Sequence, residues 1–108
     1  MTGDADVQAG ICGHRTTIGA ETADGRRVSF TVETTCDNIE RLKARLAAAG
    51  PVDAYGEINP RASSTVVAHA REAAICTDCI VPAAALKAMR VAAGLALPAD
   101  ASIAIKKD

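Results

Sequence analysis

The first third of the chain alternates apolar and polar residues in the manner of strands that bury one face. Residues 16–22 and 27–34 show this alternation most clearly, and residues 7–12 form a shorter strand candidate. Asp24-Gly25 stands between the two alternating segments and predicts a tight hairpin turn there. The apolar faces of the two segments carry Ile18 and Ala20 in the first, and Val28, Phe30 and Val32 in the second.

The hydrophobic period then changes from that of a strand to that of a helix. Residues 37–49 place apolar side chains three and four positions apart, which predicts a helix with one buried stripe. Gly50-Pro51 supplies the residues that end such a helix. The buried stripe of this helix consists of Ile39, Leu42 and Leu46. Its charged residues, Glu40, Arg41, Lys43 and Arg45, are expected to form a solvated face.

Two further helices are predicted after an irregular stretch over residues 52–61. Ser63 or Ser64 can cap a helix that continues to about residue 74. Pro82 suits the first turn of a third helix over residues 83–93, which Gly94 can terminate. The apolar face of the earlier helix is expected to carry Val67, Ala70 and Ala74.

The end of the chain returns to alternation, since Ala101, Ile103 and Ile105 share one face of a predicted final strand. The order of elements is therefore βββαααβ over a single domain, residues 1–108. Strands followed by helices are typical of the α+β class. We predict a two-layer fold, with a mostly antiparallel sheet of about four strands and about three helices on one face. The other sheet face is expected to meet water through Arg27, Ser29, Thr31 and Glu33.

Charge and aromatic content argue against two classes of partner. The net charge is -1, and Phe30 and Tyr55 are the only aromatic residues, so neither a basic patch nor a base-stacking platform is expected. The longest apolar stretch, residues 80–97, contains Lys87 and Arg90 and suits a buried helix rather than a membrane span. No secretory leader pattern is visible, so we expect a cytoplasmic protein that binds neither nucleic acid nor membrane.

The candidate chemistry lies in four cysteines. Cys12, Cys36, Cys76 and Cys79 all fall at predicted element ends or in connections rather than inside an apolar pattern. In a reducing compartment such cysteines are more often metal ligands or redox groups than disulfides. Cys76-Thr77-Asp78-Cys79 has the spacing that lets two sulfurs chelate one ion, and His14 is an additional candidate ligand.

Two of the cysteines are predicted to have a reason for reactivity. Cys36 and Cys79 lie at or close to predicted helix N-termini, where unpaired N–H groups and the helix dipole favour a thiolate. The alternative for each cysteine is a small core residue, because cysteine is among the most buried residue types. For His14 the plain alternative is a turn residue.

The order of these residues resembles the iron–sulfur cluster scaffold proteins of the IscU and NifU N-terminal type. The resemblance rests on Cys12-Gly13 before a strand, Cys36 at a helix start, and Cys79 before the alanine-rich helix at 83–93. It implies that Cys12, Cys36 and Cys79 hold a nascent cluster or a zinc ion, although His14 stands where that family has aspartate.

The chain is also similar to a family of small prokaryotic proteins without an assigned function, which share the Cys-Gly and Cys-helix order. That family also shares the ending found here from Val81-Pro82 through Leu97-Pro98. A local similarity to TusA-type sulfur carriers covers Cys79-Ile80-Val81-Pro82.

These observations leave three hypotheses. The first is a module that binds zinc or an iron–sulfur cluster through Cys12, Cys36, Cys76 and Cys79, acting as a scaffold rather than an enzyme. The second is a thiol redox or sulfur-carrier protein with Cys79 as its nucleophile and Cys76 as the resolving thiol. The third is a non-catalytic interaction domain. The alanine-rich face of residues 83–93 could pack against a second copy as easily as against the sheet, which leaves a homodimer open.

Overall fold

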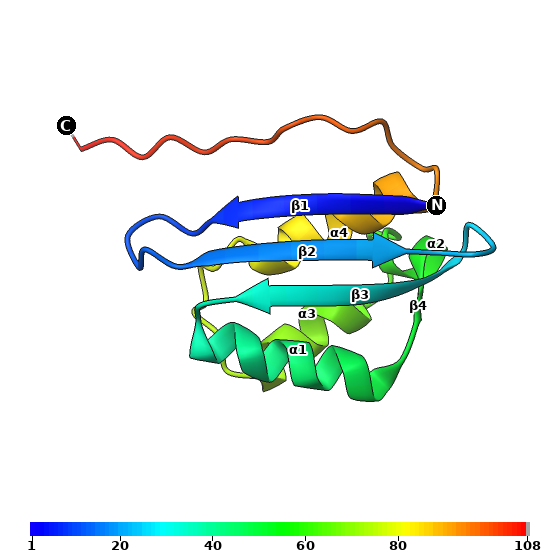
Figure 1. Ribbon diagram of the computed structural model, residues 1–108, viewed down its shortest axis with the longest axis horizontal. Helices are drawn as coiled ribbons and strands as arrows, with labels where there is room; N and C mark the ends of the chain where they lie inside the picture. Colours follow the sequence, from blue (N-terminus) through cyan, green and yellow to red (C-terminus); the bar gives the residue numbers. More distant parts are fainter. Residues whose placement is uncertain (108) are drawn as a thin grey trace.

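Three antiparallel strands open the chain, and the helices that follow cover one face of the sheet (Figure 1). The computed structural model describes residues 1–107. The sheet has four strands in the order β1-β2-β3-β4, and every neighbouring pair is antiparallel. The predicted α+β class and two-layer arrangement are confirmed. The elements are β1 (Thr2–Gln8), β2 (Arg15–Glu21), β3 (Arg27–Thr34), α1 (Asp37–Ala49), β4 (Val52–Asp53), α2 (Ala54–Glu57), α3 (Thr65–Glu72) and α4 (Val81–Ala92).

The β2–β3 hairpin is closed by the predicted Asp24-Gly25 turn. The Asp24 carboxylate accepts hydrogen bonds from the backbone N–H groups of Arg26 and Arg27, both at 2.9 Å. These bonds, led by the one from Arg27, hold the pKa of the Asp24 carboxyl below its ordinary value. Gly25 takes a φ of 77°, a left-handed conformation that glycine adopts without steric cost. The polar face of β3 is exposed, as the alternation predicts.

Helix α1 has the predicted bounds. Gly50 ends it with a φ of 78°, and the N–H of Gly50 donates to the Leu46 carbonyl at 3.2 Å.

Helix α3 begins after Ser64, whose hydroxyl accepts from the Val67 N–H. Val66, rather than the predicted Val67, faces the core, and Val67 is 39% exposed. Ala70 is buried as predicted, but the predicted Ala74 is exposed, because α3 ends at Glu72 and Ala73 is the buried residue there.

A buried carboxylate holds the start of α3 in place. Glu57 in α2 accepts from the backbone N–H of Thr65 at 2.8 Å and of Val66 at 3.2 Å, and also from the Ser64 hydroxyl. The first N–H groups of a helix have no partner inside the helix. Glu57 therefore satisfies donors that α3 leaves open, and its negative charge lies at the positive end of the helix dipole.

Helix α4 lies unusually close to the sheet, above β1 and β2. A Cβ atom added at Gly3 would come within 2.3 Å of the Ala88 carbonyl oxygen and 2.9 Å of the Ala92 nitrogen. The two backbones approach this closely because Gly3 has no side chain and α4 presents small residues to it. The alanine-rich face of α4 therefore packs on the sheet, through Ala85, Ala88, Met89 and Ala92.

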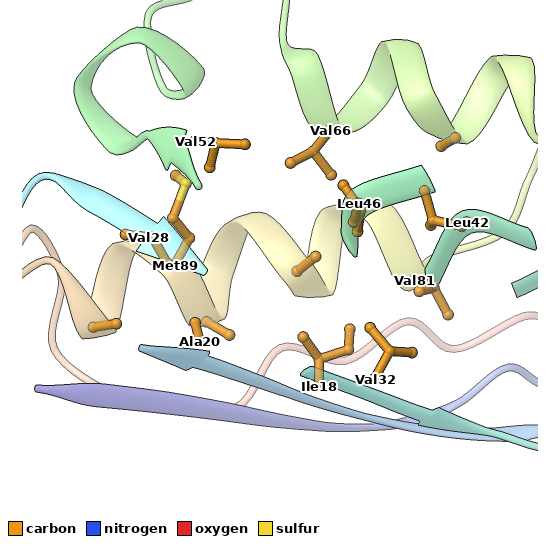
Figure 2. Packing of buried hydrophobic residues seen from close by; sticks show 14 of the residues in the cluster. Ile18, Ala20, Val28, Val32, Leu42, Leu46, Val52, Val66, Val81 and Met89 are labelled. Atoms are coloured by element: carbon orange, nitrogen blue, oxygen red, sulfur yellow. The ribbon is translucent and has the colours of Figure 1, made fainter. Parts of the chain in front are cut away.

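The core between the two layers is made of aliphatic side chains and one methionine. Figure 2 shows Met89 of α4 among Val28 of β3 and Val52 of β4, and all three are at most 5% exposed. An unbranched methionine can fill the irregular gap left where small alanines give way to valines. The fully buried side chains are Ile18, Ile39, Leu42, Met89, Val28, Val66 and Val81.

Two strand predictions are wrong. The first strand covers Thr2–Gln8, not residues 7–12, so Cys12 lies in the loop before β2 rather than at a strand end. The inner positions of β1 include Gly3 and Ala5, which are too small to give a recognisable alternation. Pairing with β2 decides the register of β1, with Ala5 opposite Ile18.

The predicted final strand at 101–105 is also wrong, because this segment is extended but pairs with no strand in residues 1–107. The fourth strand is β4, which comes from the stretch that was expected to be irregular. None of the helices in residues 1–107 combines the length and apolar character that crossing a membrane requires.

The close approach of β1 and α4 predicts that adding one methyl group at Gly3 destabilises the protein. Gly3→Ala should lower the free energy of unfolding by about 1 to 3 kcal/mol, because the new Cβ collides with backbone rather than with a flexible side chain. Gly56→Ala is the matched control, since its Cβ would meet only ordinary contacts of 3.6 Å or more. Urea unfolding of both variants checks this, and equal stability of the two would contradict it.

Candidate functional site

All four cysteines line one cavity at the end of the sheet where β1 ends and β2 begins. The cavity has a volume of about 210 Å³. Cys12 reaches it from the β1–β2 loop, Cys36 from the start of α1, and Cys76 and Cys79 from the α3–α4 connection. In Figure 1 the β1–β2 loop, the start of α1 and the start of α4 gather at the left end of the sheet. Three separate chain segments therefore bring sulfur atoms to one place.

Cys36 is held by the junction between β3 and α1. Its N–H donates to the Thr34 hydroxyl at 3.1 Å, and its carbonyl accepts from the Glu40 N–H at 3.0 Å. The Thr34 hydroxyl is itself bonded to that of Thr16 at 2.8 Å. Cys36 is the N-cap residue of α1, and its side chain makes no capping hydrogen bond. The sulfur, which is half-buried, is thus free to face the cavity.

The Cys76–Cys79 segment forms a tight turn that Arg41 fastens to α1. The Cys79 N–H donates to the Cys76 carbonyl at 3.1 Å, which closes the turn. The Arg41 guanidinium donates to the carbonyls of Ala73 at 2.8 Å and Ala74 at 3.2 Å, just before that turn. It also donates to the Asn38 side-chain oxygen at 2.7 Å. Arg41 therefore couples the helix that begins at Cys36 to the segment that carries the other pair.

These contacts correct the expectation that the charged side of α1 is merely solvated. Arg41 binds the end of α3, and Arg45 forms an ion pair with Glu72 of the same helix. Only the contacts between helices reveal this, because an arginine on a polar helix face looks the same in sequence whether or not a partner lies opposite. Lys43 is exposed, as expected.

His14 lies in the cavity lining and belongs to the β1–β2 loop, residues 9–14. Its Nδ1 is hydrogen-bonded to the Thr35 hydroxyl at 3.0 Å, which leaves Nε2 as the ring nitrogen without a partner among residues 1–107. Gly10 and Gly13 both have positive φ, and a Cβ on either would meet nothing within 4 Å. The loop therefore has few packing contacts, and Cys12 within it is exposed. His69 is not part of the cavity lining.

Burial makes the Cys79 thiol less acidic than its position near a helix N-terminus predicts. Helix α4 begins at Val81 with Ile80 as N-cap, so Cys79 lies just outside the first turn. Desolvation raises the pKa of the Cys79 thiol, and a hydrogen bond from the Val81 N–H opposes this only in part. Negative charge on Cys36, Cys76 and Cys12 raises it further. The predicted thiolate preference at Cys79 is therefore wrong for the metal-free protein.

The remaining cavity walls are mostly apolar, and the sequence did not indicate that these residues line a site. Ile39 and Val81 are core residues at the starts of α1 and α4, whereas Ile11 stands fully exposed in the loop beside Cys12. Within residues 1–107, no three His, Cys, Asp or Glu side chains lie close enough together to hold a metal ion as they stand. The four free thiols thus share a cavity without forming a closed ligand set.

The raised pKa predicts how Cys79 reacts. Because the pKa of the Cys79 thiol is higher in the folded than in the unfolded protein, folding favours the protonated thiol. The resulting contribution to the free energy of unfolding is complete below the unfolded-state pKa, and it is lost as pH rises through the folded-state pKa. In a variant with the other three cysteines changed to serine, alkylation of Cys79 by iodoacetamide should have a midpoint at higher pH than in urea. A midpoint at or below the urea value would contradict the dominance of burial.

The contacts of Arg41 predict a difference between two basic residues of α1: Arg41, which is hydrogen-bonded to the end of α3, and the exposed Lys43. Arg41→Ala should lower the free energy of unfolding by about 1 to 2 kcal/mol, since it removes charged hydrogen bonds at a partly exposed site. Lys43→Ala should change it by less than about 0.5 kcal/mol. Hydrogen exchange should also show faster exchange at residues 75–79 in the first variant alone. Similar exchange in both would show that Arg41 does not hold the turn.

The comparisons with known proteins place the chain without assigning it an activity. No curated protein and no solved structure matches it, and no link to the IscU or NifU scaffold proteins is found. One family profile matches residues 4–105, which includes all four cysteines and every helix and strand but the first residues of β1. The chain therefore belongs to the family of unknown function DUF6951.

Proposed function

We propose that this protein binds a zinc ion or an iron–sulfur cluster through Cys12, Cys36, Cys76 and Cys79, as a scaffold rather than as an enzyme. The observation that carries the proposal is the shared cavity. The cysteines come from three segments separated by whole secondary-structure elements, and every cysteine of the chain lines the same cavity. Thiols distributed for packing alone would have no reason to gather in this way.

The donor set suits the proposed ligands. Four thiolates can close a tetrahedral zinc site or hold a [2Fe–2S] or [4Fe–4S] cluster. A zinc ion would tie the three segments together, whereas a cluster would supply electron-transfer or cluster-delivery chemistry. His14 can replace one sulfur, because its Nε2 is free while its Nδ1 is held by Thr35.

Two of the four cysteines are held in place by the fold, and the other two would have to move inward to reach a bound ion. Cys36 and Cys79 are half-buried and lie at the starts of helices that pack on the sheet. Cys12 and Cys76 are exposed, the first in a glycine-containing loop. Binding would draw these two sulfurs inward, so the free energy of binding is reduced by the ordering of the loop. Such a balance suits a scaffold, which must release what it holds.

Proton release links binding to pH. A thiol must lose its proton before it can coordinate a metal. Because burial raises the pKa of Cys79, this ligand resists deprotonation more than a free cysteine does. The apparent affinity should therefore fall as pH falls. The same raised pKa counts against the alternative of Cys79 as a ready nucleophile in thiol redox or sulfur-carrier chemistry.

Elemental analysis and an absorption spectrum of protein purified without oxygen test the proposal. We expect about one equivalent of zinc, or iron with visible absorption from sulfur-to-iron charge transfer. Cys36→Ser and Cys79→Ser should each lose most of the metal. His14→Ala should weaken binding, and His69→Ala, outside the cavity, should leave it unchanged. Zinc at 100 times Kd should raise the stability of the wild-type protein by about 2.7 kcal/mol.

Two results would reject metal or cluster binding. One is protein that stays metal-free after anaerobic purification with zinc and after cluster reconstitution, yet is folded by circular dichroism. The other is metal that persists when all four cysteines are replaced by serine. In the first case, one cysteine that alkylates much faster than the others would favour thiol chemistry. Uniformly slow alkylation would favour a non-catalytic interaction domain.

A further inference from the structure

The end of the chain has the pattern of a strand but no strand to pair with. Residues 98–107 are extended and exposed, and residues 96–107 make no backbone hydrogen bond to any of the described residues. Leu97, Ile103 and Ile105 are 89%, 69% and 88% exposed. Large apolar side chains at alternating positions are typical of a strand with one buried face. This terminal segment, residues 98–107, therefore exposes a face suited to burial.

The free edge of β1 offers the pairing that the terminal segment lacks. β1 is the first strand of the sheet and pairs only with β2, so the backbone groups on its other side have no strand partner in residues 1–107. A long unpaired edge strand is a template for another strand. β1 has seven residues, or about 23 Å, and residues 98–107 span about 33 Å when extended. The segment is long enough to cover the whole edge.

The side chains of the two strands are complementary. On the inner face, Ala5 of β1 is half-buried at the rim of the core, where an added strand could place Ile103 and Ile105. On the outer face, β1 carries the exposed carboxylates of Asp4 and Asp6, and Asp6 pairs with Arg15 of β2. Lys106 lies on the side of the terminal segment opposite the two isoleucines. The same alignment therefore buries the apolar side chains and brings a lysine toward two carboxylates.

We propose that the terminal segment pairs with the β1 edge of a second copy of this chain and adds a fifth strand to that copy's sheet. In Figure 1 the segment runs on the β1 side of the sheet in the direction of β1, and its end projects past the end of that strand. No backbone hydrogen bond joins residues 96–107 to the other described residues. Pro98 is the first residue of the segment, where its fixed φ stiffens the departing chain. Reciprocal exchange of the two segments gives a closed twofold dimer.

This proposal is independent of the cysteine site, and its test is the oligomeric state. Size-exclusion chromatography with light scattering should give twice the mass of one chain at high protein concentration. The double variant Ile103→Lys/Ile105→Lys should be monomeric at the same concentration. The matched control, Ser102→Lys/Ala104→Lys, adds the same charge on the opposite face, next to Asp4 and Asp6, and should stay dimeric. Because all four positions are exposed, both variants should keep the wild-type circular dichroism spectrum.

Three outcomes would overturn the proposal. The first is a wild-type protein that stays monomeric at every concentration. The second is a dimer that survives Ile103→Lys/Ile105→Lys, which would place the interface elsewhere. The third is a monomer in which hydrogen exchange protects residues 101–106, which would show that the segment folds onto β1 of its own chain.

Discussion

The contact between β1 and α4 is the constraint on which the rest of the molecule depends. Because Gly3 has no side chain, the backbone of α4 can approach that of β1 at Ala88 and Ala92. This contact sets the position of α4 above the sheet, and the start of α4 then falls at the end of the sheet where β3 gives way to α1. Cys79 and Cys36 share a cavity for that reason.

The cavity combines rigid and loosely held parts, and this combination limits what chemistry the site can perform. Cys36 is held by hydrogen bonds of the β3–α1 junction, and the Cys76–Cys79 turn is held by Arg41. Cys12 depends on a loop with few packing contacts. Under the proposed function, the loop would close on a bound ion or cluster and open to release it. The raised pKa of the Cys79 thiol counts against this one residue as a ready nucleophile.

β1 has two roles, because its inner face contacts α4 and its outer edge pairs with no strand in the described part of the chain. The small residues that permit the close helix contact also leave this edge with little side-chain cover. An exposed edge of seven residues invites pairing with another strand, and charges such as those of Asp4 and Asp6 restrict which strand can join. The chain itself carries a segment with matching apolar alternation and a lysine. Closure of the sheet by a second copy would thus remove both the free edge and the exposed isoleucines.

Short-range sequence features by themselves determined the β2–β3 hairpin, the bounds of α1, the Ser64 cap of α3, the existence of a helix that has Pro82 in its first turn, and the α+β class. Each of these follows from the period of apolar residues and from turn or cap chemistry within a few residues. The ends of the last two helices differ from the prediction, since α3 ends at Glu72 and α4 covers Val81–Ala92. The positions of the four cysteines at element ends or in connections also follow from residues near them in the sequence. Their gathering in one cavity, the fastening by Arg41 and the register of β1 were decided only in the tertiary structure. These features depend on contacts between residues far apart in sequence. The terminal segment is the clearest case: its alternation is written in the sequence, but a strand exists only where a second strand supplies its hydrogen bonds.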